Sequence, residues 1–213
     1  MVIHRTTIFQ NREHAACLLA ERLMEHERSD AIVVAVSGGG IHVGFKLAQK
    51  LQLPLEAIPC LKLKHPADDS KTIGAVCAGA IVIHEDDNNI PQDFIYHQIQ
   101  LLQHTIRGKS RRYQSDNLEH LLKGKVVILA DDVLMTGDTM LACLRTIRKY
   151  NPWEIIVAIP IVTPTGAKAI RDELDKLIYL AIEPQLYVNY YAEFPDVSDD
   201  EVTTLLQQAR TPA

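Results

Sequence analysis

The chain has 213 residues, of which 47% are hydrophobic and 23% are charged, and its formal net charge is −5 at pH 7. This length suits one α/β domain with a sizeable core and a small appended part, and the acidic balance lacks the basic excess typical of proteins that bind nucleic acid. No apolar run approaches the roughly 18 residues of a membrane span, and no N-terminal segment has the apolar centre of a signal peptide. A cytoplasmic protein without nucleic-acid or membrane partners is therefore expected.

The four cysteines and nine histidines are scattered along the chain. The cysteines lie in apolar segments without CxxC spacing, which predicts reduced residues buried in the core. Spacing alone indicates no zinc site. The cysteines are Cys17, Cys60, Cys77 and Cys143.

The first elements along the chain predict half of a βαβ unit. Apolar residues spaced for one buried stripe predict a helix over residues 11–27. Residues 31–36 read AIVVAV, which predicts a buried strand, and residues 37–40 form a glycine-rich turn before a helix over residues 41–51.

This glycine turn also permits a second interpretation. Gly38, Gly40 and Gly44 follow a predicted strand, and Glu56 near the end of the next strand could serve as a ribose acid. The spacing differs by one residue from the dinucleotide-binding motif GxGxxG, so this alternative is the weaker one.

The middle of the chain is less regular. Residues 55–61 predict a strand, residues 62–70 a polar and mobile loop, and residues 73–83 a hairpin beside the sheet. A turn is expected at residues 85–89, and an amphipathic helix over residues 91–112, beginning with a proline in its first turn.

The second half returns to strands that alternate with helices. Residues 113–122 form a linker with a short helical turn, and residues 126–130 (VVILA) form a buried strand. Residues 155–162 predict a strand, residues 165–174 a helix and residues 177–182 a last strand. Repeated β-α-β order predicts an open, mainly parallel, twisted sheet flanked by helices.

The segment after residue 130 carries the clearest functional signal. Asp131 and Asp132 end the strand, and adjacent carboxylates at a strand end can bond to sugar hydroxyls or orient the water shell of Mg²⁺. Thr136, Gly137 and Thr139 then open an amphipathic helix, whose free amide groups would hold a phosphate. The alternative is a polar loop in which these residues only cap the helix.

Aromatic residues concentrate after the last predicted strand. They either pack in the core, which is favoured, or cover the sheet end near a ligand, or form a subunit contact. They are Tyr187, Tyr190, Tyr191 and Phe194.

The pattern of residues 126–139 resembles the phosphoribosyl pyrophosphate (PRPP) signature of type I phosphoribosyltransferases. Over nearly the whole chain, the sequence is similar to a small bacterial group of predicted phosphoribosyltransferases. The likeness includes residues 61–76 and an ending formed by Tyr191, Phe194 and residues 197–202. The chain departs from the group at three places. Residues 37–40 lack the arginine of its Pro-Arg-Gly-Gly loop, residues 61–70 lack an arginine and a glutamate, and Asp138 replaces a small residue.

The resemblance implies a single phosphoribosyltransferase-like domain over residues 1–213. Within it, residues 62–117 would contain a mobile loop and a hood-like insertion, and residues 183–213 a C-terminal tail. Related folds often form homodimers.

The resemblance also implies a reaction, in which ribose 5-phosphate passes from PRPP to a nitrogenous acceptor and pyrophosphate is released, with Mg²⁺ as cofactor. Asp131 and Asp132 would be the catalytic acids that hold the ribose hydroxyls. The residues that bind the 5′-phosphate would be Met135, Thr136, Gly137, Asp138 and Thr139, and those that bind pyrophosphate would be Ser37, Gly38, Gly39, Gly40 and Lys62.

Two positions qualify this expectation. Met135 stands where 6-oxopurine transferases carry an aspartate, which disfavours hypoxanthine or guanine as the acceptor. Asp138 and the absent arginine leave open a non-catalytic sensor that binds PRPP or a nucleotide 5′-phosphate.

Overall fold

The computed structural model describes residues 8–84, 90–115, 117–184 and 190–211. The turn expected at residues 85–89 and the aromatic residue Tyr187 lie outside these ranges. Within them, no helix combines the length and the apolar character that crossing a bilayer requires.

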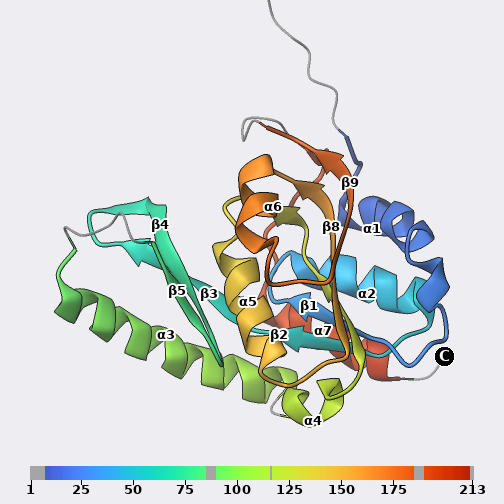
Figure 1. Ribbon diagram of the computed structural model, residues 1–213, viewed down its shortest axis with the longest axis horizontal. Helices are drawn as coiled ribbons and strands as arrows, with labels where there is room; N and C mark the ends of the chain where they lie inside the picture. Colours follow the sequence, from blue (N-terminus) through green and yellow to red (C-terminus); the bar gives the residue numbers. More distant parts are fainter. Residues whose placement is uncertain (1–7, 85–89, 116, 185–189, 212–213) are drawn as a thin grey trace, which may run out of the picture.

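The centre of the protein is a six-stranded sheet in which every pairing is parallel (Figure 1). The order is β2-β1-β6-β8, and β7 and β9 both pair with β8. The expected open parallel sheet is thus confirmed. Its strands are β1 (Ile32–Val36), β2 (Leu55–Ile58), β6 (Val126–Ala130), β7 (Val133–Leu134), β8 (Glu154–Val162) and β9 (Lys176–Ile182).

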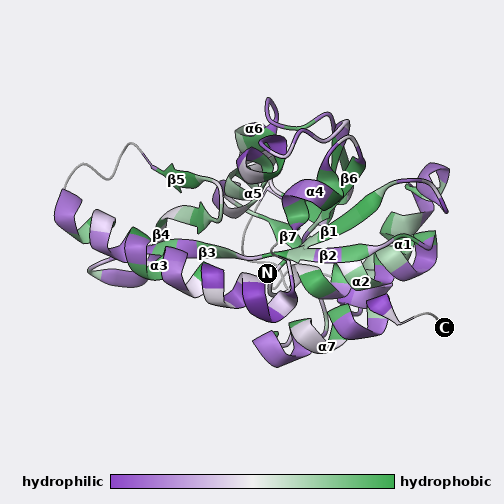
Figure 2. Ribbon diagram, turned by 90° about the horizontal axis from the view of Figure 1, so that it is seen from below, coloured by the Kyte–Doolittle hydropathy of each residue, from purple (hydrophilic) through white to green (hydrophobic). Residues whose placement is uncertain are grey.

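Helices cover both faces of this sheet, because successive side chains of each strand point to opposite faces. Val33 and Ala35 of β1 pack in the same cluster as α1, α2 and α7, whereas Val34 and Val36 pack in the cluster that contains α4, α5 and α6. Figure 2 shows the central strands as hydrophobic and the outer helices as mixed. The helices are α1 (Arg12–Glu21), α2 (Gly40–Leu51), α4 (Leu118–Leu122), α5 (Asp138–Arg148), α6 (Pro164–Ile170) and α7 (Asp199–Arg210).

A second, antiparallel sheet lies beside the first with α3 (Gln92–Tyr113) along it (Figure 1). It has the order β3-β4-β5, from β3 (Cys60–His65), β4 (Asp68–Cys77) and β5 (Ile81–Ile83). The predicted hairpin is present, but the polar loop expected at residues 62–70 is wrong, since these residues extend β3 and begin β4.

The physical reason is an alternation that the lysines obscure. Lys62 and Lys64 are exposed while Leu63 between them is buried, which is the period of a strand with one solvated face. The strand expected at residues 55–61 is also two strands, because Pro59 separates them and proline cannot donate to a ladder.

Three helix predictions need correction. The first helix ends at Glu21, and a short 3₁₀ turn (Met24–His26) follows it. Helix α6 ends at Ile170, four residues before its predicted end, and α7 was not predicted at all. Its start did carry a signal, because Ser198 caps the helix by accepting a hydrogen bond from Glu201 N–H (3.2 Å), and Ser-x-x-Glu is the capping-box pattern.

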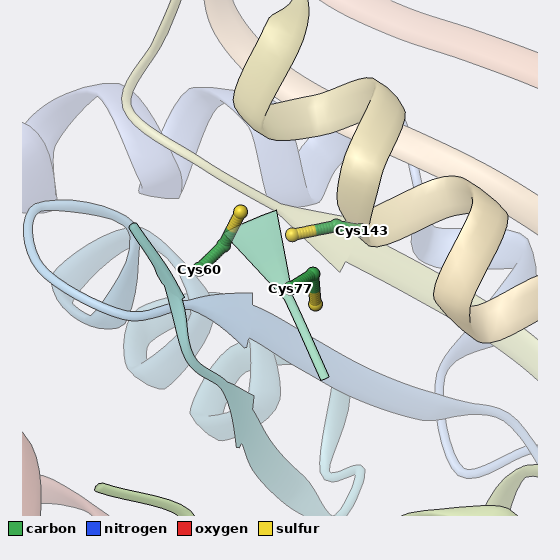
Figure 3. Close-up of side chains that lie close together, drawn as sticks. All are labelled: Cys60, Cys77 and Cys143. Atoms are coloured by element: carbon green, nitrogen blue, oxygen red, sulfur yellow. The ribbon is translucent and has the colours of Figure 1, made fainter. Parts of the chain in front are cut away.

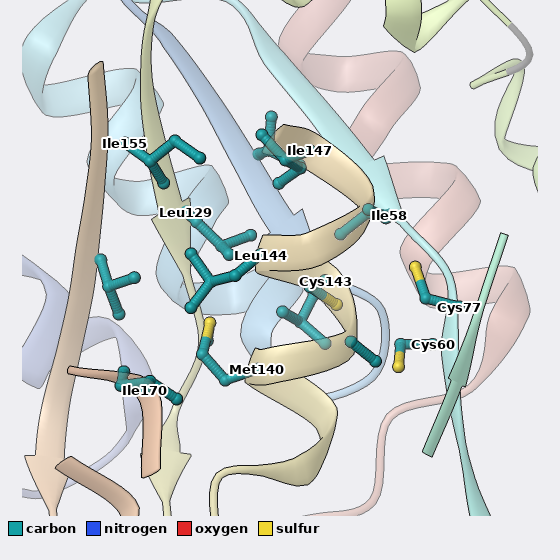
Figure 4. Close-up of a cluster of buried hydrophobic side chains, with 14 of the residues drawn as sticks. Ile58, Cys60, Cys77, Leu129, Met140, Cys143, Leu144, Ile147, Ile155 and Ile170 are labelled. Atoms are coloured by element: carbon teal, nitrogen blue, oxygen red, sulfur yellow. The ribbon is translucent and has the colours of Figure 1, made fainter. Parts of the chain in front are cut away.

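Three of the four cysteines lie close together in the fold, although they are far apart in the sequence. Cys60, Cys77 and Cys143 are buried, as predicted, whereas the prediction is wrong for Cys17, which is partly exposed. Strands β3 and β4 and helix α5 bring the three buried sulfur atoms within 4.8 Å of one another (Figure 3). Figure 4 shows Cys143 on α5 within the apolar cluster and Cys60 and Cys77 at its edge.

Candidate functional site

A cavity of about 480 Å³ opens at the carboxyl ends of β1 and β6. From β1 the chain proceeds to β2 on one side, and from β6 to β8 on the other, so this is the switch point where open α/β sheets bind ligands. Nine predicted site residues line the cavity, namely Ser37, Lys62, Asp131, Asp132, Met135, Thr136, Gly137, Asp138 and Thr139.

The two acids lie at the floor of this cavity. Asp131 accepts a hydrogen bond on Oδ1 from the N–H of Asp132 (2.9 Å). Burial raises the pKa of Asp131 well above its usual range, the neighbouring carboxylate of Asp132 adds to the rise, and the charge of Lys62 opposes it. A cation or a set of hydroxyl donors beside Asp131 would therefore favour its ionised form, which burial disfavours.

Arg12 is a site residue that the sequence did not reveal. Its Nε donates to Asp132 Oδ2 (2.7 Å) and its Nη1 to the carbonyl oxygen of Pro195 (2.8 Å). The arginine is buried and lines the cavity, although it belongs to α1, remote in sequence from the acids. An isolated arginine in an amphipathic helix gives no sign of such a partner.

Aromatic side chains hold Arg12 and the acids in place. The guanidinium carbon of Arg12 lies 3.7 Å from the ring centre of Phe194, and Phe194 stacks on Tyr191 with ring centres 5.0 Å apart. Tyr191 donates its Oη hydrogen to the carbonyl oxygen of Asp132 (2.8 Å). Tyr190 and Tyr191 are buried and line the cavity, so two of the expected roles, core packing and cover for the sheet end, coincide.

The glycine turn after β1 packs directly against the acids. A Cβ on Gly39 would come within 1.8 Å of Asp132 Oδ2 and within 2.9 Å of Arg12 Nε. A Cβ on Gly40 would come within 2.9 Å of Asp131 Oδ1. Gly39 and Gly40 therefore permit the close approach of the turn to the acid pair, and Gly38 has φ +99°, which favours glycine. None of these three glycines is among the residues that line the cavity.

The second turn, after β6, opens a helix N-terminus toward the cavity. Gly137 has φ +98° and is the N-cap of α5, without a side-chain hydrogen bond to cap it. The first amide groups of an α-helix have no partner within the helix. Helix α6 supports this turn, since a Cβ on Gly166 would lie 2.7 Å from the carbonyl oxygen of Met135. The turn can therefore receive an anion.

Asp138 is neither solvated nor a simple cap. It is buried, its Oδ1 lies 2.7 Å from His84 Nε2, and its Oδ2 accepts a hydrogen bond from Thr136 Oγ1 (2.7 Å). His84 directly follows β5, so the antiparallel sheet contacts the anion-binding turn through this pair. The carboxylate still places negative charge at the turn.

The dinucleotide alternative loses its ribose acid. Glu56 pairs with Arg210 of α7 (2.9 Å) and is not among the residues that line the cavity. Its carboxylate has a structural partner, and the glycine turn has a packing role against the acids.

The arrangement can hold a sugar phosphate with a second anion. The amide groups at the start of α5 face an anion at one end, and the acids can accept bonds from hydroxyl groups. Ser37, Lys62 and Arg12 bring donors and positive charge to the other end. One cavity therefore brings together carboxylate acceptors, a helix start and positive side chains.

A family model described as the phosphoribosyl transferase domain matches residues 4–185. Two curated proteins from strains of Mycobacterium tuberculosis, both provisionally named phosphoribosyl transferase, are 26% identical over 212 residues. The match covers 95% of this chain but 47% of each relative, so the chain spans about half the length of these proteins.

Solved structures resemble the fold. The Thermus thermophilus protein TT1426 superposes with a TM-score of 0.74 at 25% identity, covering 94% of this chain and 98% of that one. A hypothetical protein from Neisseria gonorrhoeae with bound ppGpp has a TM-score of 0.53 at 18% identity, covering 97% and 100%. The second likeness concerns the fold alone.

Proposed function

This chain belongs to the phosphoribosyl transferase domain family, and from that premise we propose that it transfers ribose 5-phosphate from PRPP to a nitrogenous acceptor and releases pyrophosphate. One observation carries the proposal: the acid pair and the uncapped start of α5 line the same cavity at the sheet switch point. A sugar monophosphate needs both features at once.

Different residues of the cavity would bind different parts of PRPP. The amides of residues 136–139 hold the 5′-phosphate, and Asp131 and Asp132 accept bonds from the ribose hydroxyls. Lys62, Ser37 and Arg12 face the pyrophosphate, with Gly38 and Gly39 shaping the turn behind it.

In the reaction, the bond between the ribose anomeric carbon and the pyrophosphate oxygen breaks, and its electron pair leaves with pyrophosphate. Positive charge develops on the sugar beside the acids, while negative charge grows beside Lys62 and Arg12. The acceptor nitrogen forms the new bond with its lone pair and then loses a proton. Fixed charges of the correct sign near each centre lower the barrier.

The acid pair also fits a hydrated Mg²⁺. Oxygen ligands from two adjacent carboxylates suit this ion. A cation beside Asp131 would favour the ionised form of its carboxyl group, which burial and Asp132 disfavour. When bound with PRPP, Mg²⁺ would neutralise part of the pyrophosphate charge.

The side chains that line the cavity above the acids would select the nitrogenous acceptor. Met135 is partly exposed in the cavity wall and has no ionisable group for a purine oxygen, so a 6-oxopurine is a poor acceptor. We assign residues 62–117 the role of a hood, because Lys62 lines the cavity and His84 reaches the turn.

Titration calorimetry with PRPP and Mg²⁺ tests the proposal. The native protein should bind PRPP, and the double variant Asp131→Asn, Asp132→Asn should lose at least about 100-fold in affinity, or about 2.7 kcal/mol. A matched control is Asp172→Asn plus Asp175→Asn, which removes the same charge outside the cavity lining. Equal binding by native protein and double variant would refute the proposed site.

A second candidate function is a sensor that binds PRPP or a nucleotide 5′-phosphate without catalysis. The position of Asp138 at the turn and the lack of an arginine in residues 37–40 favour it. Pyrophosphate release with any member of a panel of bases and amines would exclude the sensor. Binding without release across that panel would favour it over the transferase.

A further inference from the structure

Three thiols meet behind the candidate site. Cys60 begins β3, Cys77 ends β4 and Cys143 lies within α5, with all three sulfur atoms within 4.8 Å of one another (Figure 3). Cys60 lies in the wall of the site cavity, and Cys77 lies in the wall of a second cavity of about 560 Å³. A small solute can therefore approach this cluster from two cavities.

The backbone favours one pair among the three. Cys60 and Cys77 are direct partners in the antiparallel ladder of β3 and β4. Such partners have Cα atoms about 4.5–5.5 Å apart, which falls within the roughly 4.4–6.8 Å that a disulfide spans. Cys143 belongs to a helix packed on these strands. The strand pair can close by side-chain rotation, with little movement of the backbone.

The number of ligands favours a disulfide over a structural metal site. A structural zinc site takes four ligands, and the group that meets here among the described residues offers three thiols. A disulfide is uncharged and suits the apolar surroundings. Hydrogen bonds from Cys143 and Cys60 hold the pKa of Cys77 below its usual value, and the thiolate is the form of cysteine that reacts with a peroxide.

We propose that Cys60 and Cys77 are a modification site, at which a hydroperoxide forms a reversible cross-strand disulfide that weakens phosphate binding by residues 136–139. The thiolate of Cys77 attacks one peroxide oxygen and the O–O bond breaks. The leaving hydroxide takes a proton to become water, or, with an organic hydroperoxide, the leaving alkoxide takes a proton to become an alcohol. The resulting sulfenic acid is attacked by the sulfur of Cys60. The S–O bond breaks, the S–S bond forms and water leaves, so two thiols lose two electrons and one peroxide gains them.

The effect on the site follows from one contact and rests on the proposed function. The Sγ of Cys60 lies 3.6 Å from the carbonyl oxygen of Thr139, which belongs to the phosphate turn. Rotation of Cys60 toward Cys77 removes this contact and changes the cavity wall. The turn then loses a support on the side of the second sheet.

The first experiment detects the disulfide without any ligand. It uses Cys17→Ser, because Cys17 is partly exposed on α1 and lies outside the cluster. Treatment with hydrogen peroxide should reduce the free thiols of this variant from three to one. Peptide mapping should find Cys60 joined to Cys77, and dithiothreitol should restore both thiols. Three surviving thiols, a sulfinic acid, or a disulfide that contains Cys143 would overturn the assignment.

The second experiment measures PRPP affinity with Mg²⁺ before and after peroxide treatment. Oxidised Cys17→Ser protein should bind about fivefold more weakly, at the lower end of typical coupling between sites. The matched control is the same protein with Cys77→Ala added, whose affinity should not respond to peroxide. A disulfide without a change in affinity would overturn the effect on the site. Absence of PRPP binding to reduced protein would instead refute the proposed function, because the thiol mapping needs no ligand.

Discussion

The two ends of the candidate site are built in different ways. Residues 131–139 form one continuous segment that provides the acids and the phosphate turn. The opposite end takes Arg12 from α1, the glycine turn after β1 and Lys62 from β3. The comparison teaches that one end depends on a single local segment, whereas the other end depends on how a helix, a turn and a strand pack together.

The largest effect is expected at the junction of the two ends. Gly39→Ala places a Cβ 1.8 Å from Asp132 Oδ2, so the acid must move and its pairing with Arg12 must break. We expect a loss of about 2–3 kcal/mol in unfolding free energy in urea, together with loss of PRPP binding. Gly108→Ala is the control, because its Cβ meets nothing within 4 Å in α3 and should stabilise the protein slightly. Native affinity in Gly39→Ala would show that the glycine turn and the acids are not coupled.

The variant Arg12→Gln tests the two ends of the site separately, because each end is proposed to bind a different ligand. Loss of the guanidinium should weaken the binding of pyrophosphate with Mg²⁺ about tenfold, or about 1.4 kcal/mol, and should affect ribose 5-phosphate much less. Stability should also fall by about 1–2 kcal/mol, because the largely buried carboxylate of Asp132 loses its partner. Arg22→Gln, beyond the end of the same helix, should change neither affinity. Equal losses for both ligands would mean that Arg12 acts only through the fold.

Without a bound ligand, Asp131 is expected to lower the free energy of unfolding. Burial raises the pKa of Asp131 in the folded protein. The ionised carboxylate is therefore less favourable in the folded state than in the unfolded state. Asp131→Asn should therefore be more stable than the native protein at neutral pH by about 1 kcal/mol. This advantage should disappear as the pH falls below the unfolded value of about 3.9. Urea melts of both proteins between pH 3 and pH 8 would measure it, and a constant difference across that range would contradict the argument.

The smallest effect is expected at the phosphate turn. Asp138→Asn removes a like charge from the anion site, so ribose 5-phosphate should bind about threefold more tightly, or about 0.6 kcal/mol. Asp200→Asn at the start of α7 removes a comparable first-turn acid and should leave this affinity unchanged. Weaker binding by Asp138→Asn in calorimetry would show that the Asp138 carboxylate supports the turn rather than opposing the anion.

Local patterns were sufficient for much of the fold. The run of residues 126–130 and the helix after it were placed correctly, because a strand buried on both faces and an amphipathic helix have distinct periods. The hairpin at residues 73–83 was recognised but begins earlier, at Asp68. The strand residues within 62–70 were predicted as a loop, because exposed lysines on one face hid the buried residue between them.

The sequence by itself placed Asp131 and Asp132 at the end of a strand and Gly137 in the turn before a helix, since these residues are neighbours along the chain. The alternation of strands and helices along the chain also predicted the parallel sheet. Only the tertiary structure decided that Arg12 pairs with Asp132 and that Glu56 pairs with Arg210. It also decided that three cysteines far apart in the sequence lie together. These contacts join residues from different elements, and their partners are fixed by how helices and strands pack across the sheet rather than by any local pattern.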